Sequence, residues 1–325
     1  MSSPAAQTEP RPTAIAVVGV GRSGTSAITR GVQALGVELG DHLRPAGAKN
    51  PTGFFEDQDL LAINKRLKRL LRIRGDSVRL IERDEWRAPA VRALQQEAIA
   101  TVRRRFGAHP LWGYKYARTL RLLPFWSEVF TAVPVDVRYV VALRNPLSVA
   151  RSRAKLDPQR GTQEQSDLEW LVNVVPYFRE LRAHPFVVVD YDLVLADPAA
   201  QLRRVAAALA LPGTPQREAA LGAYAGEYLR PGMRHSVFAD RDLDGRVNEL
   251  TAAAYRWLRR LATDDGTAAD AARWSEWEAI EQRLAALAPV LRHLDRVQAE
   301  LRRAQWNPLG PVGAAVRAWR RYRRG

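Results

Sequence analysis

Short apolar runs and amphipathic stripes alternate along the chain. Three runs have an apolar centre, at residues 14–19 (AIAVVG), 136–146 (DVRYVVALRNP) and 185–198 (PFVVVDYDLVLADP). Compact apolar runs of this kind are typical of central strands in a parallel sheet, because such strands are buried on both faces. A segment with helical rhythm follows each run. The pattern therefore predicts an α/β fold with a central, mainly parallel sheet flanked by helices.

Segments with helical periodicity lie between the predicted strands and after the last one. It is clearest at 59–73 and 89–106, which lie between the first and second runs, and at 198–211, after the third. The second run ends at Asn145-Pro146, where Asn can cap a helix and Pro suits the first helical position. We therefore expect a helix to begin directly after this strand.

The C-terminal part of the chain has a different pattern. Apolar residues recur there in steps of three and four, at Trp277, Ile280, Leu284, Leu287, Leu291 and Leu294. This heptad-like stripe either packs on the rest of the chain or pairs with a second copy in a homodimer. An Arg/Trp-rich tail follows at 307–325, which is either solvated or contacts a membrane surface or another polyanion. We expect a helical C-terminal extension with a basic tail over 265–325.

Composition narrows the class of protein. Of the 325 residues 46% are hydrophobic, enough for a sizeable core, and none is cysteine, which excludes disulfides, thiolate metal sites and cysteine nucleophiles. No uninterrupted apolar stretch of membrane-spanning length exists, and residues 1–12 lack the features of a signal peptide. We expect a disordered N-terminus over 1–12 and a soluble, cytoplasmic protein.

The formal net charge of +15 favours an anionic partner. A small anionic ligand, nucleic acid and an acidic membrane surface all suit such a balance. Lysine is scarce among the basic residues, with five in the chain: Lys49, Lys65, Lys68, Lys115 and Lys155. A lysine beside a motif is therefore informative.

A glycine-rich turn follows the first predicted strand, in the sequence GVGRSGTS (19–26). Backbone N–H groups of such a turn at a helix N-terminus form an anion site. Gly19 and Gly24 have the spacing of a nucleotide-hydrolysing phosphate loop, yet Thr25 stands where that loop has lysine. A magnesium nucleotide is therefore disfavoured, although VVVDYD could supply a metal-binding Asp. A glycine-rich turn without a ligand is the plain alternative.

A second anion site is predicted after the second strand. Arg144 closes that strand, and Ser152 lies eight residues later, about two turns into the following helix. Both can face the carboxyl edge of the sheet, where open α/β folds bind their ligands.

Two anion sites in this order resemble the sulfotransferase family that uses 3′-phosphoadenosine-5′-phosphosulfate (PAPS), in its bacterial form. RSGTS (22–26) and RNPLSVARS (144–152) are similar to the family's two nucleotide-binding motifs. The likeness extends over roughly 14–262, through further segments at 35–67, 112–126, 191–198 and 229–236. It implies a P-loop-type three-layer sandwich, with a sulfotransferase domain at 13–264. It also implies an enzyme of the EC 2.8.2 type with PAPS as donor, adenosine 3′,5′-bisphosphate (PAP) as product and no metal.

The resemblance also implies roles for individual residues. The 5′-phosphosulfate would be held by the first motif, namely Arg22, Ser23, Gly24, Thr25 and Ser26. Arg144 and Ser152 would hold the 3′-phosphate, and Arg234 with His235 resembles a late basic motif that closes over the same phosphate. Lys115 matches a family lysine near the reacting sulfonate. Catalytic roles therefore fall to Arg22 and Lys115, together with a base that accepts the acceptor's proton.

The identity of that base is open. Cytosolic relatives use a histidine two residues after the lysine, but this chain has Ala117 there. Carbohydrate-directed and bacterial relatives use a downstream glutamate, which favours Glu56. Asp57, Asp59 and His42 are the alternatives.

The sequence therefore predicts sulfuryl transfer from PAPS, in line, to an acceptor hydroxyl on a carbohydrate, lipid or other small metabolite. No nucleic-acid partner is expected. Two alternatives remain. One is a P-loop kinase or nucleotide hydrolase with a degenerate loop, and the other is a non-catalytic polyanion- or membrane-binding protein.

Overall fold

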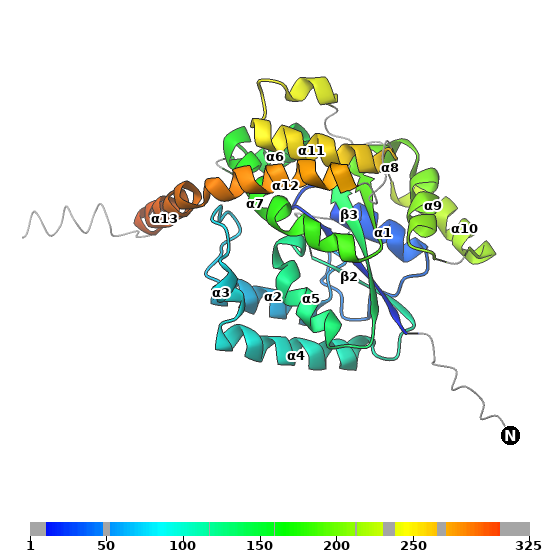
Figure 1. Cartoon of the computed structure of the whole chain (residues 1–325). Coiled ribbons are helices and arrows are strands. Elements are labelled where there is room, and N and C mark those ends of the chain that lie inside the picture. Colours follow the sequence, from blue (N-terminus) through cyan, green and yellow to red (C-terminus); the bar gives the residue numbers. More distant parts are fainter. Residues whose placement is uncertain are drawn as a thin grey trace, which may run out of the picture.

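A four-stranded parallel sheet forms the centre of the computed structural model (Figure 1). The structure describes residues 11–47, 53–116, 118–158, 160–211, 213–229, 238–264 and 271–305. Predictions that concern residues 1–10, Ala117, Arg234, His235 and the tail at 307–325 lie outside these ranges.

The strands are β1 (Thr13–Gly19), β2 (Leu111–Lys115), β3 (Asp136–Leu143) and β4 (Phe186–Asp190), in the order β2-β1-β3-β4. All neighbours pair in parallel. The three apolar runs correspond to β1, β3 and β4. The sequence pattern did not single out β2, because its five residues, LWGYK, carry a glycine and no unbroken apolar run.

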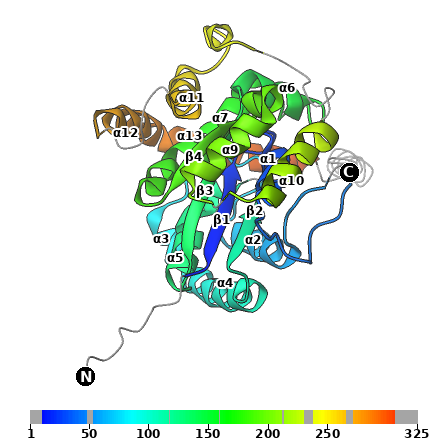
Figure 2. The same cartoon turned by 90° about the vertical axis from the view of Figure 1, so that its right-hand side faces the viewer.

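Helices cover both faces of the sheet, which confirms the predicted three-layer α/β fold. One face is covered by α1 (Thr25–Ala34), α9 (Pro198–Ala208) and α10 (Pro215–Ala223). Their apolar residues form one core with Ile15 and Val17 of β1. These three helices lie on one side of the sheet in both views (Figures 1 and 2).

A larger core covers the other face. The helices that contribute to it are α2 (Gln58–Leu70), α4 (Pro89–Phe106), α5 (Leu123–Thr131), α7 (Gln163–Phe178) and α11 (Glu249–Ala262). The helical periodicity predicted at 59–73, 89–106 and 198–211 is confirmed by α2, α4 and α9.

The helices that follow β3 and β4 begin at side-chain caps. α6 (Pro146–Ala154) starts as expected, with Pro146 in its first turn and the Asn145 side chain accepting from the Leu147 N–H at 3.0 Å. At the end of β4, Asp190 caps α8 (Tyr191–Ala196) in the same way. One cap lies two residues after β3 and the other is the last residue of β4, so each helix begins close to the carboxyl end of its strand.

Shorter elements complete the described structure. They are α3 (Arg83–Trp86), 3₁₀ turns at Leu120–Leu122, Arg179–Ala183 and Asp240–Leu243, and a π turn at Tyr224–Tyr228.

The C-terminal extension consists of α12 (Ala271–Ala286) and α13 (Ala288–Gln305). Trp277 packs against Phe178 and Trp257, with ring centroids 4.9 Å apart in both pairs. Ile280, Leu284 and Leu291 are also buried. Most of the heptad-like stripe therefore packs on the chain itself, while Leu287 is exposed.

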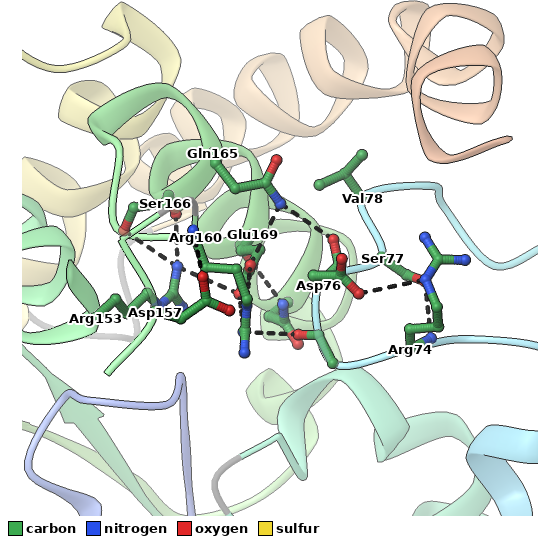
Figure 3. Close-up of polar contacts among 12 residues, drawn as sticks. Arg74, Asp76, Ser77, Val78, Arg153, Asp157, Arg160, Gln165, Ser166 and Glu169 are labelled. Carbon is green, nitrogen blue, oxygen red and sulfur yellow. Dashed lines mark hydrogen bonds and ion pairs between the residues drawn. The ribbon is translucent and has the colours of Figure 1, made fainter. Parts of the chain in front are cut away.

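A buried polar network lies beside this extension, between α7 and the segment that follows α2 (Figure 3). Glu169 of α7 accepts two hydrogen bonds from Arg160, at 2.9 and 2.7 Å, and lies 3.4 Å from Arg153. Arg160 also donates to the Gly75 carbonyl at 2.9 Å. These contacts fix the loop at 74–80 against the core.

No helix within the described ranges is long and apolar enough to cross a membrane.

Candidate functional site

The two predicted anion sites lie at neighbouring strand ends. β1 and β3 pair directly, and Gly19 stands beside Ala142 in their register. In the sheet, β2 lies on one side of β1, and β3 and β4 lie on the other side of β1. The end of β1 is thus the topological switch point, the position at which open α/β sheets form a crevice for ligands.

The glycine-rich turn presents the N-terminus of α1 to this crevice. Arg22 and Gly24 have positive φ angles, of 79° and 82°, and Gly24 is the N-cap. The first turn of α1 carries no acidic residue, and the Ser23 hydroxyl turns inward to donate to the Val20 carbonyl at 2.7 Å. Backbone N–H groups at this end are therefore oriented for an anion.

Arg22, Arg144 and Ser152 form one hydrogen-bonded cluster around the turn. Arg22 Nε donates to Ser152 Oγ at 3.0 Å, and Arg144 Nη1 donates to the Arg22 carbonyl at 3.2 Å. The guanidinium of Arg144 stacks over the Tyr191 ring, 4.7 Å from its centroid. The structure thus brings the two predicted sites together, with Arg22 between them.

No carboxylate of the described residues neutralises the positive charge of this cluster. Within the described ranges, neither Arg22 nor Arg144 has a carboxylate at ion-pairing distance, and Arg144 Nε has no hydrogen-bond partner although Arg144 is only 5% exposed. Partial burial, and then the charge of Arg144, lower the pKa of Arg22 below its ordinary value. A buried guanidinium with an unpaired N–H indicates a binding partner that is anionic.

Lys115 ends β2 and is buried at the same edge of the sheet. Its Nζ lies 2.9 Å from the Phe54 carbonyl, 3.1 Å from Glu56 Oε1 and 3.3 Å from Ser26 Oγ. Burial lowers the pKa of Lys115, and the Glu56 carboxylate opposes that shift. Lys115 is therefore not an ordinary surface lysine, and it links the phosphate loop to Glu56.

Glu56 lies between two cations. Its Oε2 accepts from Arg44 Nη1 at 3.1 Å, while Oε1 faces Lys115. The Arg44 guanidinium stacks on Phe54, 3.8 Å from the ring centroid, and the Arg44 side chain remains 42% exposed. Among the four residues considered for the base, Glu56 is the one that contacts Lys115.

The other three lie in a separate cluster around Arg105. The Asp57 carboxylate caps α2 through the Asp59 and Leu60 N–H groups and pairs with Arg105 at 2.8 Å. Asp59 pairs with Arg105 at 3.4 Å and with His42 at 3.5 Å. These contacts hold the three side chains at Arg105 and at the start of α2, whereas Glu56 contacts Lys115.

Asp190 bears on the magnesium-nucleotide alternative. It ends β4, which β3 separates from β1, and it is almost fully buried. One carboxylate oxygen caps α8, and the other faces Arg259 at 3.7 Å. This aspartate is therefore a helix cap rather than a group that faces the phosphate loop.

Sequence reasoning missed two residues of the site, Tyr191 and Arg44. Tyr191 follows the end of β4 directly, and its ring occupies the space beside Gly24. Arg44 reaches Glu56 through a short bridge between Leu43 and Asp57. Tyr191 carried a usable signal, because it is an aromatic residue at a strand end. Arg44 carried none, since its contact depends on that loop pairing.

Comparisons with known proteins give a distant likeness. No model of a protein family matches the sequence, and no curated protein does.

Among solved structures, sulfotransferase STF9 from Mycobacterium avium is similar at 16% identity, over 68% of this chain and 69% of that one, with a TM-score of 0.43. The sulfotransferase domain of the Synechococcus PCC 7002 olefin synthase is similar at 14% identity, over 85% and 95%, with a TM-score of 0.39. Retinol dehydratase, in complex with androsterone and the inactive cofactor PAP, is similar at 14% identity, over 88% and 81%, with a TM-score of 0.32. Two of these three solved structures are bacterial sulfotransferases or domains of one. All three have TM-scores below 0.5.

Proposed function

We propose that this chain is a PAPS-dependent sulfotransferase that transfers a sulfuryl group to an acceptor hydroxyl. The observation that carries the proposal is the pair of arginines, Arg22 and Arg144, at the N-terminus of α1 and the switch point of the sheet, which have no acidic partner among the described residues. Two arginines in one hydrogen-bonded cluster favour an anionic ligand. A nucleotide with a phosphosulfate and a separate ribose phosphate has that charge in two places.

The residues present fit such a donor. Arg22 and the N–H groups at the start of α1 would hold the 5′ phosphosulfate, with the Ser26 hydroxyl beside them. Arg144 and Ser152 would hold the 3′ phosphate, and the unpaired Nε of Arg144 supplies a donor for it. Arg234 and His235 remain proposed contacts from outside the described residues.

Sulfuryl transfer requires alignment and charge stabilisation, much as phosphoryl transfer does. A new bond forms between the acceptor oxygen and sulfur as the bond between sulfur and the leaving phosphate oxygen breaks. Arg22 and Lys115 stabilise the negative charge on the leaving phosphate and the sulfonate oxygens. Glu56 accepts the proton of the acceptor hydroxyl, and Lys115 at 3.1 Å holds its carboxylate in place.

The acceptor is a carbohydrate, a lipid or another small metabolite with a hydroxyl group. The alternative of a degenerate P-loop kinase or nucleotide hydrolase has less support, because the loop lacks lysine and Asp190 caps α8. The alternative of a non-catalytic polyanion-binding protein does not explain a buried Lys115–Glu56 pair beside the phosphate loop.

The first test is nucleotide binding by titration calorimetry in buffer without magnesium. PAP should bind with a 1:1 stoichiometry, and adenosine 5′-monophosphate should bind more weakly because it lacks the phosphate that Arg144 would hold. ATP with magnesium is the comparison for the kinase alternative. Tighter binding of ATP with magnesium than of PAP, together with ATP turnover, would replace this proposal by that alternative.

The second test is turnover with radiolabelled PAPS against extracted glycans and lipids. Once an acceptor is found, Glu56→Gln should lower kcat about 10²- to 10⁴-fold, because general base catalysis is lost, while PAP binding is retained. Asp59→Asn is the matched control, since Asp59 lies in the Arg105 cluster. A rate that survives in Glu56→Gln and falls in Asp59→Asn would assign the base to Asp59 instead.

A further inference from the structure

Exposed apolar side chains gather on α13. Of the five large apolar residues that are exposed within the described ranges, three lie here: Leu287, which directly precedes the helix, Val290 and Leu301, at 40%, 63% and 58% exposure. In Figure 1, α13 lies at the edge of the molecule, beyond α12 and away from the sheet. A single exposed leucine is ordinary on a protein surface, whereas several on one helix indicate a binding surface.

These side chains belong to one stripe. Leu287, Val290, Leu294, Val297 and Leu301 follow one another in steps of three and four residues, which places them on one side of the helix. Leu294 and Val297, between the exposed positions, are themselves partly exposed. These five residues are called the α13 stripe below.

A different side of α13 attaches the helix to the chain. Leu291 is only 2% exposed, and Asp295 accepts from the Val78 N–H at 2.9 Å. Gln298 donates to the Gln165 side chain at 2.7 Å. These three positions of α13 form a row beside the α13 stripe, so the exposed residues of the stripe are not what holds the helix in place.

The chain beyond the α13 stripe is basic. Residues 306–325 contain five arginines and no acidic residue. They also contain Trp306, Trp319 and Tyr322, which are the aromatic types that prefer the boundary between lipid and water. An apolar surface followed by a basic, acid-free segment fits a partner with an apolar interior and an anionic surface.

The arginines of α13 itself add to this charge in part. Arg292 and Arg302 are each paired with an acid from the first third of the chain. Arg296 and Arg303 are exposed and have no acidic partner among the described residues. A second copy of the chain is a poorer partner than an anionic surface, since parallel pairing through the stripe would bring two basic segments together.

We propose that the α13 stripe and residues 306–325 bind the surface of a membrane that contains anionic lipids. The exposed side chains of the stripe, above all Val290 and Leu301, enter the boundary between headgroups and acyl chains, and the arginines lie among the lipid phosphates. Apolar burial and electrostatic attraction are each weak alone, but together they hold a protein on a bilayer. This attachment is independent of the proposed sulfuryl transfer, because α13 contributes no residue to the phosphate loop.

Flotation of the full chain with lipid vesicles tests this attachment. Vesicles of phosphatidylcholine and phosphatidylglycerol in equal parts should carry the chain, and vesicles of phosphatidylcholine alone should bind it at least about tenfold more weakly. Val290→Ser/Leu301→Ser should weaken binding to the anionic vesicles about tenfold or more, because two apolar side chains no longer enter the lipid. Both positions are exposed, so this variant should fold as the wild type does.

Two further variants complete the experiment. Leu70→Ser/Leu156→Ser is the matched control, because it removes two leucines of similar exposure, 42% and 47%, away from α13, and it should bind as the wild type does. Arg320→Gln/Arg321→Gln/Arg323→Gln/Arg324→Gln should remove the preference for anionic vesicles, since most of the charge of residues 306–325 is lost.

The proposal would be overturned if the wild type does not float with anionic vesicles, or if Val290→Ser/Leu301→Ser binds them equally well. An undiminished preference for anionic vesicles in the arginine variant would also overturn it. So would a dimer, seen by light scattering without lipid, that Val290→Ser/Leu301→Ser converts to a monomer, because the α13 stripe would then pair two copies of the chain.

Discussion

At the scale of single residues, Gly24 shows how the conformation of the phosphate loop and its packing against Tyr191 require the absence of a side chain at one position. Its φ angle is 82°, and a Cβ placed there would lie 2.0 Å from the Tyr191 ring. Gly24→Ala should therefore cost about 2–4 kcal/mol of the free energy of unfolding, from backbone strain and overpacking. Urea unfolding measures this loss.

The matched control for that variant lies in the same turn. A Cβ placed at Gly21 would meet no atom within 4 Å, and the φ angle of Gly21 is not positive. Gly21→Ala should change the free energy of unfolding by less than about 1 kcal/mol. If both variants unfold at the same urea concentration, the packing of Tyr191 against the loop is not what requires glycine at position 24.

The site residues differ in how far the sequence could predict them. The positions of the turn at 19–26 and of Arg144 could be predicted, because each lies where a strand is followed directly by a helix in the sequence. Lys115 and Glu56 were each reached only through resemblance, and the contact between them, across 59 positions of the chain, was not predicted. The convergence of Arg22 and Ser152 was not foreseen, because it depends on β1 and β3 being neighbours.

At the scale of elements, periodicity predicted the long helices and the strands with unbroken apolar cores. β2 was missed because its five residues obtain their strand geometry from pairing with β1 rather than from their own pattern. The C-terminal stripe showed that α12 has an apolar face, but a heptad pattern cannot tell a partner in the same chain from one in another. In the fold, Trp277 of this stripe packs on Phe178 and Trp257 of the same chain.

The attachment of α13 gives a prediction at this scale. Asp295 Oδ1 accepts from the buried Val78 N–H at 2.9 Å and lies 3.4 Å from Arg74 Nη2. Asp295→Ala should lower the free energy of unfolding by about 1–3 kcal/mol, because the N–H group loses its acceptor. Asp295→Asn should cost less, since its carbonyl oxygen can still accept.

Hydrogen exchange at residues 74–80 is the second readout for Asp295→Ala and should speed up with the loss of stability. Glu300→Ala is the control on the exposed side of α13. If Asp295→Ala and Glu300→Ala behave alike in both measurements, α13 does not hold this loop.

The contact between α12 and the turn after α7 should depend on pH. Partial burial, and then the nearby Glu281 carboxylate, raise the pKa of Glu180 to about 7. An unfolded glutamate titrates near pH 4.3, so the folded state binds more protons between about pH 4.3 and 7. Stability contributed by this group is therefore present at low pH and is lost as the pH rises through that window.

Glu180→Gln should remove this dependence. We expect this variant to raise the free energy of unfolding by about 1–2 kcal/mol at pH 8 and to change it little at pH 5. The value at pH 8 allows for solvent screening of the partly exposed Glu180 side chain. Urea unfolding at both pH values measures the difference. Glu278→Gln alters a half-exposed carboxylate on α12, which packs against the same turn, and is the control. A gain of equal size at pH 5 and pH 8 would mean that ionisation of Glu180 is not the cause.

At the scale of the whole molecule, the proposed donor site joins segments that are far apart in the chain. Arg22, Ser152 and Tyr191 come from the segments that follow β1, β3 and β4, and Arg144 contacts Arg22 and Tyr191. Binding of PAP should therefore stabilise the fold as a unit. At a concentration 100 times its Kd, a ligand adds about 2.7 kcal/mol, which is roughly 5–10 °C in Tm for a domain of this size.

Arg144→Ala tests this coupling. Loss of a buried, charge-assisted contact should weaken PAP binding by about 2–3 kcal/mol, so the same PAP concentration would then lie near the new Kd and add only about 0.4 kcal/mol. Thermal unfolding with and without PAP, without magnesium, should show a large Tm shift for the wild type and about 1 °C for the variant. Arg151→Ala, an exposed arginine on α6, should keep the full shift. An undiminished shift in Arg144→Ala would remove the 3′-phosphate role from this residue, because the donor would then be held without the cation that the fold buries beside its phosphate loop.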